Sequence, residues 1–253
     1  MINKTIQEVA AYLNAPCIQD EDDLRIHGVC IDSREVRPES LYIPILGQRV
    51  DGHSFVDSVR KAGCKASLWQ KDHKPYPEDM ALVLVEDTTQ ALQQLAKAYL
   101  QSLSCKVIAV TGSNGKTSCK DMLYSIFSQE TKTQKTQGNR NNEIGLPLTI
   151  LDFDADIEVA ILEMGMENKG EIEFLCAIAP PDISVITTIG SAHMENLGGK
   201  KQIAQAKLEI LENLKPNGLF LYDKTSPEID ECLQEMQIDP SKKIVSFGCG
   251  GDV

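Results

Sequence analysis

A glycine-bearing turn between an apolar run and a helical pattern carries the clearest chemistry in this chain. The turn reads Thr-Gly-Ser-Asn-Gly-Lys-Thr over residues 111–117 and follows the apolar run 107–110. Backbone N–H groups and a helix start can bind phosphate, a lysine adds positive charge, and a threonine hydroxyl can bind Mg²⁺. The sequence therefore predicts a phosphate site. Its predicted ligands are Thr111, Gly112, Ser113, Asn114, Gly115, Lys116, Thr117 and Ser118.

The turn departs from the usual phosphate-loop pattern at one position. That pattern begins with glycine, and Val110 stands in its place. A chance turn between a strand and a helix is the simpler alternative. The departure can also be characteristic of a particular family.

Two further polar side chains follow predicted strands. Glu163 ends the apolar run 159–162, and His193 lies in a small-residue loop after the strand that contains Val185 and Ile186. Ligands of open parallel sheets bind beyond the carboxyl ends of the strands, so both residues are expected near the phosphate turn. A carboxylate there can bind Mg²⁺. The alternatives are a carboxylate facing solvent and an ordinary surface histidine.

Lys207 lies on the apolar face of the predicted helix 200–214. It is four residues after Ile203, three before Ile210 and four before Leu211. A lysine on such a face must extend to solvent, pair with an acid, or lose its charge. A neutral amine can react with CO₂ and give an anionic carbamate that binds metal.

An asparagine-rich segment spans residues 137–147. Asn139, Asn141 and Asn142 stand there among glycines and can donate many hydrogen bonds. An ordinary polar turn is the alternative interpretation.

The second part of the chain alternates strands with helices, which predicts an α/β fold with a doubly wound, mostly parallel sheet. Strands are expected at 106–111, 157–163, 183–189, 218–222 and 243–247, and helices at 117–129, 168–179, 200–214 and 227–236.

The first hundred residues indicate a smaller α/β unit. Its first helix is expected from Thr5 to Leu13, with Glu8 completing a capping box. Strands are expected at 29–31, 41–46, 66–69 and 81–85, with helices at 55–62 and from residue 88. We place a domain boundary near residues 102–104, which gives a domain 1–102 and a domain 103–253.

Composition narrows the functional classes. The chain has 253 residues, 42% hydrophobic residues and a net charge of −12, which disfavours a nucleic-acid binder. It lacks an apolar run long enough to span a bilayer and a signal-peptide core, so we expect a cytoplasmic protein without membrane insertion. The eight cysteines form no CxxC pair and are interpreted as reduced structural thiols.

Taken together, these segments resemble the Mur ligase family over nearly the whole chain. The turn 111–117 matches that family's nucleotide loop, including the missing first glycine. Asp32-Ser-Arg34 and the segment 47–53 resemble its UDP-binding segments. The blocks 138–147 and 189–195 look like the member that adds D-alanyl-D-alanine.

The resemblance implies an ATP-dependent ligase of peptidoglycan precursor synthesis. A carboxylate of UDP-N-acetylmuramoyl-tripeptide would become an acyl phosphate, which the amine of D-alanyl-D-alanine attacks. The implied catalytic residues are Lys116, His193 and Lys207. Thr117 and Glu163 would hold one Mg²⁺, and His193 with carbamylated Lys207 a second. Asn139 would contact ATP, and the UDP-linked substrate would contact Ser33, Arg34, Gln48, Arg49, His53, Asn141 and Asn142. A monomer is expected.

Two departures from the family pattern are present. Asp223 stands where members carry an asparagine near the adenine. The chain ends at Val253, inside the ATP domain of the family, so we expect the third domain to be absent and ligation to be poor. The alternatives are a substrate- or nucleotide-binding fragment without turnover, or another Mur-type amide ligase. A folylpolyglutamate synthase is disfavoured, because its phosphate loop lies much nearer the N-terminus.

Overall fold

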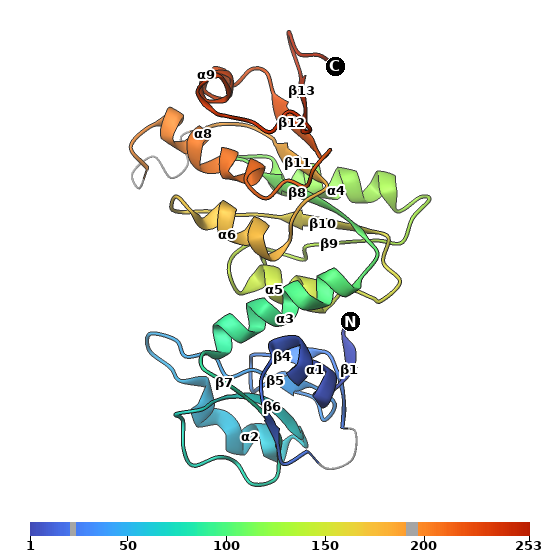
Figure 1. The fold of residues 1–253 in the computed structure, drawn as a ribbon, viewed down its shortest axis with the longest axis vertical. Coiled ribbons are helices and arrows are strands. Elements are labelled where there is room, and N and C mark those ends of the chain that lie inside the picture. The colour runs from blue at the N-terminus through green and yellow to red at the C-terminus, as the bar shows by residue number, and fades with distance from the viewer. Residues whose placement is uncertain (21–23, 191–196) are drawn as a thin grey trace. The chain divides into compact units, whose positions relative to one another are not determined.

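The computed structural model describes residues 1–20, 24–190 and 197–253, and the chain forms two compact units (Figure 1). The first unit contains Met1–Leu103 and Ile150–Ala155. The second contains Ser104–Thr149 and Asp156–Val253. No helix among the described residues is long and apolar enough to cross a membrane.

The second unit is built on a six-stranded parallel sheet with the strand order β13-β12-β11-β8-β10-β9. This confirms the predicted fold class. The strands are β8 (Lys106–Thr111), β9 (Thr133–Lys135), β10 (Val159–Glu163), β11 (Ile183–Ile186), β12 (Leu219–Asp223) and β13 (Lys243–Phe247).

Helices cover both faces of this sheet (Figure 1). Apolar side chains of α4 pack on Ile108, Val110 and Ile161, and α6 and α8 lie on the opposite face. Burial on both faces explains why the central strands are continuous apolar runs. The helices are α4 (Lys116–Phe127), α5 (Gly145–Leu151), α6 (Glu171–Ile178), α8 (Lys200–Leu208), the 3-10 helix η2 (Glu209–Leu211) and α9 (Pro227–Glu235).

Several boundaries in the second unit differ from the predictions. The predicted strand 183–189 ends at Ile186, and the predicted helix 200–214 changes to 3-10 geometry at Glu209. Helix α5 was not predicted, because its first turn contains Gly145 and Pro147 after a polar segment. Asn142 Oδ1 accepts a hydrogen bond from Gly145 N at 2.8 Å, which satisfies one free N–H group at the helix start.

The first unit contains a five-stranded sheet with the order β2-β7-β6-β5-β4, in which β2 is antiparallel to β7 and the other pairs are parallel. A two-stranded sheet pairs β1 with β3. The strands are β1 (Asn3–Thr5), β2 (Cys17–Ile18), β3 (Arg25–His27), β4 (Val29–Cys30), β5 (Leu41–Tyr42), β6 (Ala66–Gln70) and β7 (Ala81–Val85).

Helix α1 (Ile6–Leu13) confirms the predicted capping box: Thr5 accepts from Glu8 N, and Glu8 accepts from Thr5 N. The strand expected over 41–46 is only the short β5, since Pro44 has no N–H group to donate to a ladder. The other helices of this unit are η1 (Gly52–Phe55), α2 (Val56–Lys61) and α3 (Thr88–Ser102).

Candidate functional site

The predicted phosphate loop joins β8 to α4 with the geometry of an anion cradle. Gly112 and Gly115 have positive φ values of 152° and 79°, which glycine adopts at little cost. Gly115 is the N-cap of α4 and provides no side-chain cap, so the first N–H groups of the helix keep their capacity to bind an anion. Lys116 Nζ donates to Gly112 O at 2.8 Å, which holds the ammonium over the loop.

The two residues that follow β11 hold this loop in place by hydrogen bonds. Thr187 N donates to Thr111 O at 3.0 Å, and Thr187 Oγ1 donates to Asn114 O at 2.5 Å. Ser113 N donates to Thr188 O at 2.8 Å. These bonds fix the loop before any ligand arrives, which lowers the ordering cost of binding.

We expect Gly112→Ala to destabilise the protein, because a Cβ there would overlap Thr187 Oγ1 and lie 3.2 Å from Thr187 N. Gly138→Ala is a matched control, since Gly138 also has positive φ (57°) but nothing within 4 Å of its Cβ position. Thermal melting should show a loss of about 1 kcal/mol for Gly138→Ala and about 2–3 kcal/mol for Gly112→Ala. Equal losses would contradict the close packing of Thr187.

Glu163 is the centre of a buried polar cluster below the loop. The side chain is 3% exposed and accepts hydrogen bonds from Thr117 Oγ1 at 3.0 Å and Asn141 Nδ2 at 2.9 Å. Lys120 Nζ lies 3.8 Å from Glu163 Oε2 and donates to Thr136 O at 3.0 Å. The hydroxyl and carboxylate oxygens of Thr117 and Glu163 are the hard donors that Mg²⁺ prefers, so the residues fit the predicted ion.

Lys120 is a site residue that sequence reasoning missed. It lies four residues after Lys116 and is 3% exposed. Residues four apart share one face of a helix, so this spacing could have indicated a second cation beside the phosphate loop.

Lys207 is buried in α8, with 2% of its surface exposed. Burial, and to a lesser extent the positive charge of Lys116, together lower the pKa of its amine to about 7. Within the described part of the chain, its Nζ makes no hydrogen bond or ion pair. At neutral pH the amine is therefore partly unprotonated and able to react as a nucleophile.

The lowered pKa of Lys207 predicts a pH-dependent stability. Between about pH 7 and the ordinary value of 10.5, the unfolded chain binds a proton that the folded chain does not, so the free energy of unfolding rises with pH. Lys207→Met should gain on the order of a few kcal/mol over the wild type below about pH 7, and this gain should shrink toward pH 10. Denaturant titrations in CO₂-depleted buffer, with the exposed-helix control Lys201→Met, measure it. A difference independent of pH would contradict the assignment.

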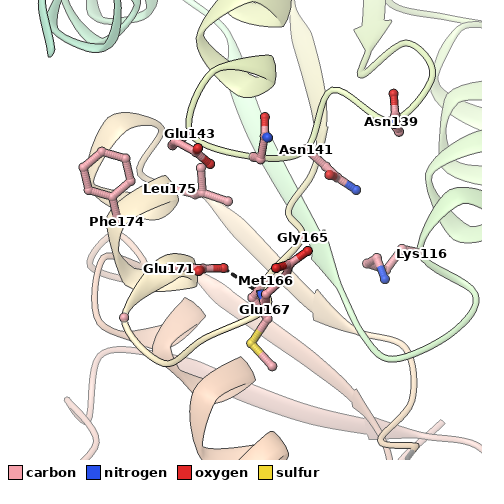
Figure 2. Close-up of a pocket in the computed structure, with 12 residues that line it drawn as sticks. Lys116, Asn139, Asn141, Glu143, Gly165, Met166, Glu167, Glu171, Phe174 and Leu175 are labelled. Atoms are coloured by element: carbon pink, nitrogen blue, oxygen red, sulfur yellow. Dashed lines mark hydrogen bonds between the residues drawn. The ribbon is translucent and has the colours of Figure 1, made fainter. Parts of the chain in front are cut away.

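A pocket of about 530 Å³ lies beside the phosphate loop in the second unit. Figure 2 shows Lys116 and Asn141 at one side of it and Phe174 at the other. Its lining combines a cation, amides, carboxylates and one ring. The pocket is lined by Lys116, Asn139, Asn141, Asn142, Glu143, Gly165, Met166, Glu167, Gly170, Glu171, Phe174 and Leu175.

The pocket also shows how the predicted residues group. Asn139, Asn141 and Asn142 lie with Lys116, so the amides assigned to the UDP-linked substrate face the same pocket as the phosphate loop. Glu143 and Glu171 were not predicted, because acidic residues on loops and helix starts are common without a binding role.

The predicted substrate residues of the first unit have different surroundings. Arg34, Gln48 and Arg49 are exposed and Ser33 is half-buried. Arg34 forms a paired contact with Asp32, with Nη2 2.6 Å from Oδ2, and this lowers the pKa of Asp32 to about 2. His53 is buried against Trp69, so it contributes little surface for a ligand.

Two predictions concern residues at strand ends. His193 lies outside the described residues. Asp223 Oδ1, at the end of β12, accepts from Thr225 N at 2.9 Å and from Thr225 Oγ1 at 2.7 Å, and thereby caps its own turn.

Comparisons with known proteins agree with this geometry. The profile described as Mur ligase middle domain matches residues 110–253, and the profile described as Mur ligase family, catalytic domain, matches residues 25–100. The UDP-N-acetylmuramoyl-tripeptide--D-alanyl-D-alanine ligase of Bacillus subtilis is 47% identical over 228 residues, 90% of this chain and 50% of its own length.

Solved structures give the same relationship. A crystal structure of MurF from Acinetobacter baumannii matches with a TM-score of 0.89 and 32% identity, over 100% of this chain and 55% of that chain. MurF from Thermotoga maritima in complex with ADP matches with a TM-score of 0.80 and 35% identity, over 92% and 53%. The chain spans about half the length of the relatives it matches. From its sequence, its fold and the geometry of its phosphate loop, the chain belongs to the Mur ligase family.

Proposed function

We propose that this protein is an ATP-dependent ligase that adds D-alanyl-D-alanine to UDP-N-acetylmuramoyl-tripeptide. The proposal rests on the loop 111–117, which hydrogen bonds with Thr187 and Thr188 hold in place. Within this loop, Thr117 Oγ1 lies 3.0 Å from Glu163 Oε2. The support from relatives is the 47% identity to the Bacillus subtilis enzyme of that name.

The reaction has two steps. A carboxylate oxygen of the tripeptide attacks the γ-phosphorus of ATP, the bond between that phosphorus and the ADP oxygen breaks, and an acyl phosphate forms. The amine nitrogen of D-alanyl-D-alanine then attacks the acyl carbon, phosphate leaves, and the nitrogen loses a proton. No nucleophile from the protein is required, so the chain contributes positioning and charge neutralisation.

Different residues of the loop provide phosphate binding and charge neutralisation. Backbone N–H groups between Thr111 and Ser118 bind phosphate oxygens, and Lys116 offsets the charge that develops between the β- and γ-phosphates. Thr117 and Glu163 would hold the first Mg²⁺, which when bound would neutralise phosphate charge.

We propose that Lys207 acts as a carbamate. Its neutral amine attacks the carbon of CO₂, a nitrogen–carbon bond forms, and a proton leaves to solvent. Burial and then the charge of Lys116 disfavour the ammonium form of Lys207, whereas the anionic product is attracted to Lys116. The carbamate oxygens and His193 would then hold a second Mg²⁺ near the acyl phosphate.

Asn141 and Asn142 would bind the peptide part of the UDP-linked substrate beside Lys116, whereas Ser33, Arg34, Gln48 and Arg49 would bind the UDP part.

UDP-linked precursors and ATP are made inside the cell, so the proposed site of action is the cytoplasm. The proposed active form is a monomer.

Release of phosphate tests the proposal. A form that spans the length of the relatives should release phosphate from ATP only when both UDP-N-acetylmuramoyl-tripeptide and D-alanyl-D-alanine are present. The 253-residue chain should bind the UDP-linked substrate but turn over poorly beside that form. Phosphate release that is independent of D-alanyl-D-alanine would contradict the assignment, and equal turnover by the two forms would contradict a need for the part that the relatives have in addition.

A further inference from the structure

A buried carboxylate that the proposed reaction does not use lies two residues after Lys207. Glu209 begins the 3-10 helix η2 and is 8% exposed. Burial raises the pKa of its carboxyl group, and hydrogen bonds from the N–H groups of Gly170 and Glu173 oppose that rise. A buried carboxylate costs free energy unless such bonds compensate it, so the place of Glu209 in the fold needs an explanation.

Glu209 caps helix α6 from a different part of the chain. The N-cap residue of α6 is Gly170, which has no side chain to bind the free N–H groups of the first turn. Gly170 N donates to Glu209 Oε1 at 2.8 Å and to Oε2 at 2.9 Å, and Glu173 N donates to Oε2 at 3.4 Å. A carboxylate at a helix N-terminus also interacts favourably with the helix dipole. Glu209 therefore holds the first turn of α6 in place.

The capped end of α6 forms one wall of the pocket beside the phosphate loop. Gly170, Glu171, Phe174 and Leu175 line that pocket, and Figure 2 shows Phe174 at the side opposite Lys116. A movement of the first turn of α6 would move these residues together. The shape of this side of the pocket therefore depends on the bonds that Glu209 accepts.

The segment that carries Glu209 also carries Lys207. Lys207 lies in the last turn of α8, close enough to Lys116 for the charge of that residue to lower its pKa. Farther along the segment, Asn213 Nδ2 donates to Glu173 O at 3.3 Å, which is a second bond to α6. Residues 207–213 therefore connect a lysine near the phosphate loop to the opposite wall of the pocket.

We propose that Glu209 is a positioning residue that holds α6 where the peptide part of the substrate requires it. The inference rests on the proposed function, which assigns this pocket to the peptide part of the UDP-linked substrate. Glu209 is not among the residues that line the pocket, so it acts through α6. Loss of its charge should weaken binding of the peptide. The phosphate loop is held separately by Thr187 and Thr188, so it should keep its affinity for nucleotide.

Parallel titrations of UDP-N-acetylmuramoyl-tripeptide and of an ATP analogue with Mg²⁺ into the 253-residue chain test this role. Glu209→Gln keeps the size of the side chain but loses its charge. Glu212→Gln is the matched control, because Glu212 is exposed and directly follows η2. We expect Glu209→Gln to bind the UDP-linked substrate about tenfold more weakly and the ATP analogue within about twofold of the wild type. Glu212→Gln should bind both ligands as the wild type does.

Steady-state kinetics should show the same selectivity. In a form that spans the length of the relatives, Glu209→Gln should raise KM for the UDP-linked substrate by about tenfold and leave kcat within about twofold. A general loss of folding would instead weaken both ligands and lower the active fraction of the enzyme. Unchanged affinity for the UDP-linked substrate, or an equal loss of affinity for both ligands, would overturn the proposal.

Amide hydrogen exchange supplies a readout that does not depend on the proposed function. Residues 170–173 should exchange about tenfold faster in Glu209→Gln, whereas the loop 111–117 should exchange as in the wild type. Equal exchange of residues 170–173 in the two proteins would overturn the proposal, because α6 would then be held without the charge of Glu209. Faster exchange in a chain whose wild type does not bind the UDP-linked substrate would contradict only the proposed function.

Discussion

Lys207→Ala is expected to reduce amide-bond formation by roughly 10²–10³-fold in a form that spans the length of the relatives. The variant removes the buried amine whose pKa is lowered to about 7, and with it the anionic group that we propose for the second Mg²⁺. Acetate should restore part of the activity, because a small carboxylate can occupy the space of the carbamate. Steady-state phosphate release with and without acetate measures both effects.

A surface lysine of the same helix provides the control for Lys207. Lys201 pairs with Glu235 at 2.7 Å on the exposed side of α8, so Lys201→Ala should retain activity and change stability by less than about 1 kcal/mol. Full activity of Lys207→Ala without acetate would exclude a metal-binding role for this residue. Loss of activity with no rescue, in a variant that still binds both substrates, would argue against the carbamate in particular.

Glu163→Gln is expected to remove the effect of Mg²⁺ on nucleotide binding and to reduce turnover by roughly 10²-fold or more. The glutamine keeps the size of the side chain but loses the charge that binds the ion. It also leaves the buried ammonium of Lys120 without the carboxylate 3.8 Å away, so stability should fall by up to about 3 kcal/mol. Titration of an ATP analogue and circular-dichroism melting measure these two effects separately.

The control for this variant lies beyond the far end of α4. Glu130 is exposed, and Glu130→Gln should leave nucleotide affinity, its Mg²⁺ dependence and the melting temperature unchanged. If Glu163→Gln bound the nucleotide with an undiminished Mg²⁺ dependence, the ion would have to be held by other groups.

The second unit was the more predictable part of the chain. Its strands are continuous apolar runs because both faces are covered, and such runs stand out from their polar surroundings. The position of Lys207 followed from helical spacing alone, since a face that contains Ile203, Ile210 and Leu211 must be buried. The structure buries all three of them together with Lys207.

Other features depend on contacts between distant residues, which spacing does not reveal. Lys120 is buried because β10 places Glu163 beside α4. Its spacing from Lys116 could have indicated a second cation near the loop, but not this contact with Glu163. His53 was interpreted as a ligand of the UDP part because of its sequence context, yet tertiary packing places it against Trp69 and His73. Helix α5 was missed because glycine and proline in its first turn oppose a helical prediction.

The central claim is that the loop 111–117 and Glu163 together bind a nucleotide through its phosphates and Mg²⁺. Calorimetric titration of a non-hydrolysable ATP analogue into the 253-residue chain tests it most directly. The account predicts binding that is at least about tenfold tighter with Mg²⁺ than with a chelator, and that is lost in Lys116→Ala. Equal affinity with and without Mg²⁺, together with unchanged affinity in Lys116→Ala, would contradict it.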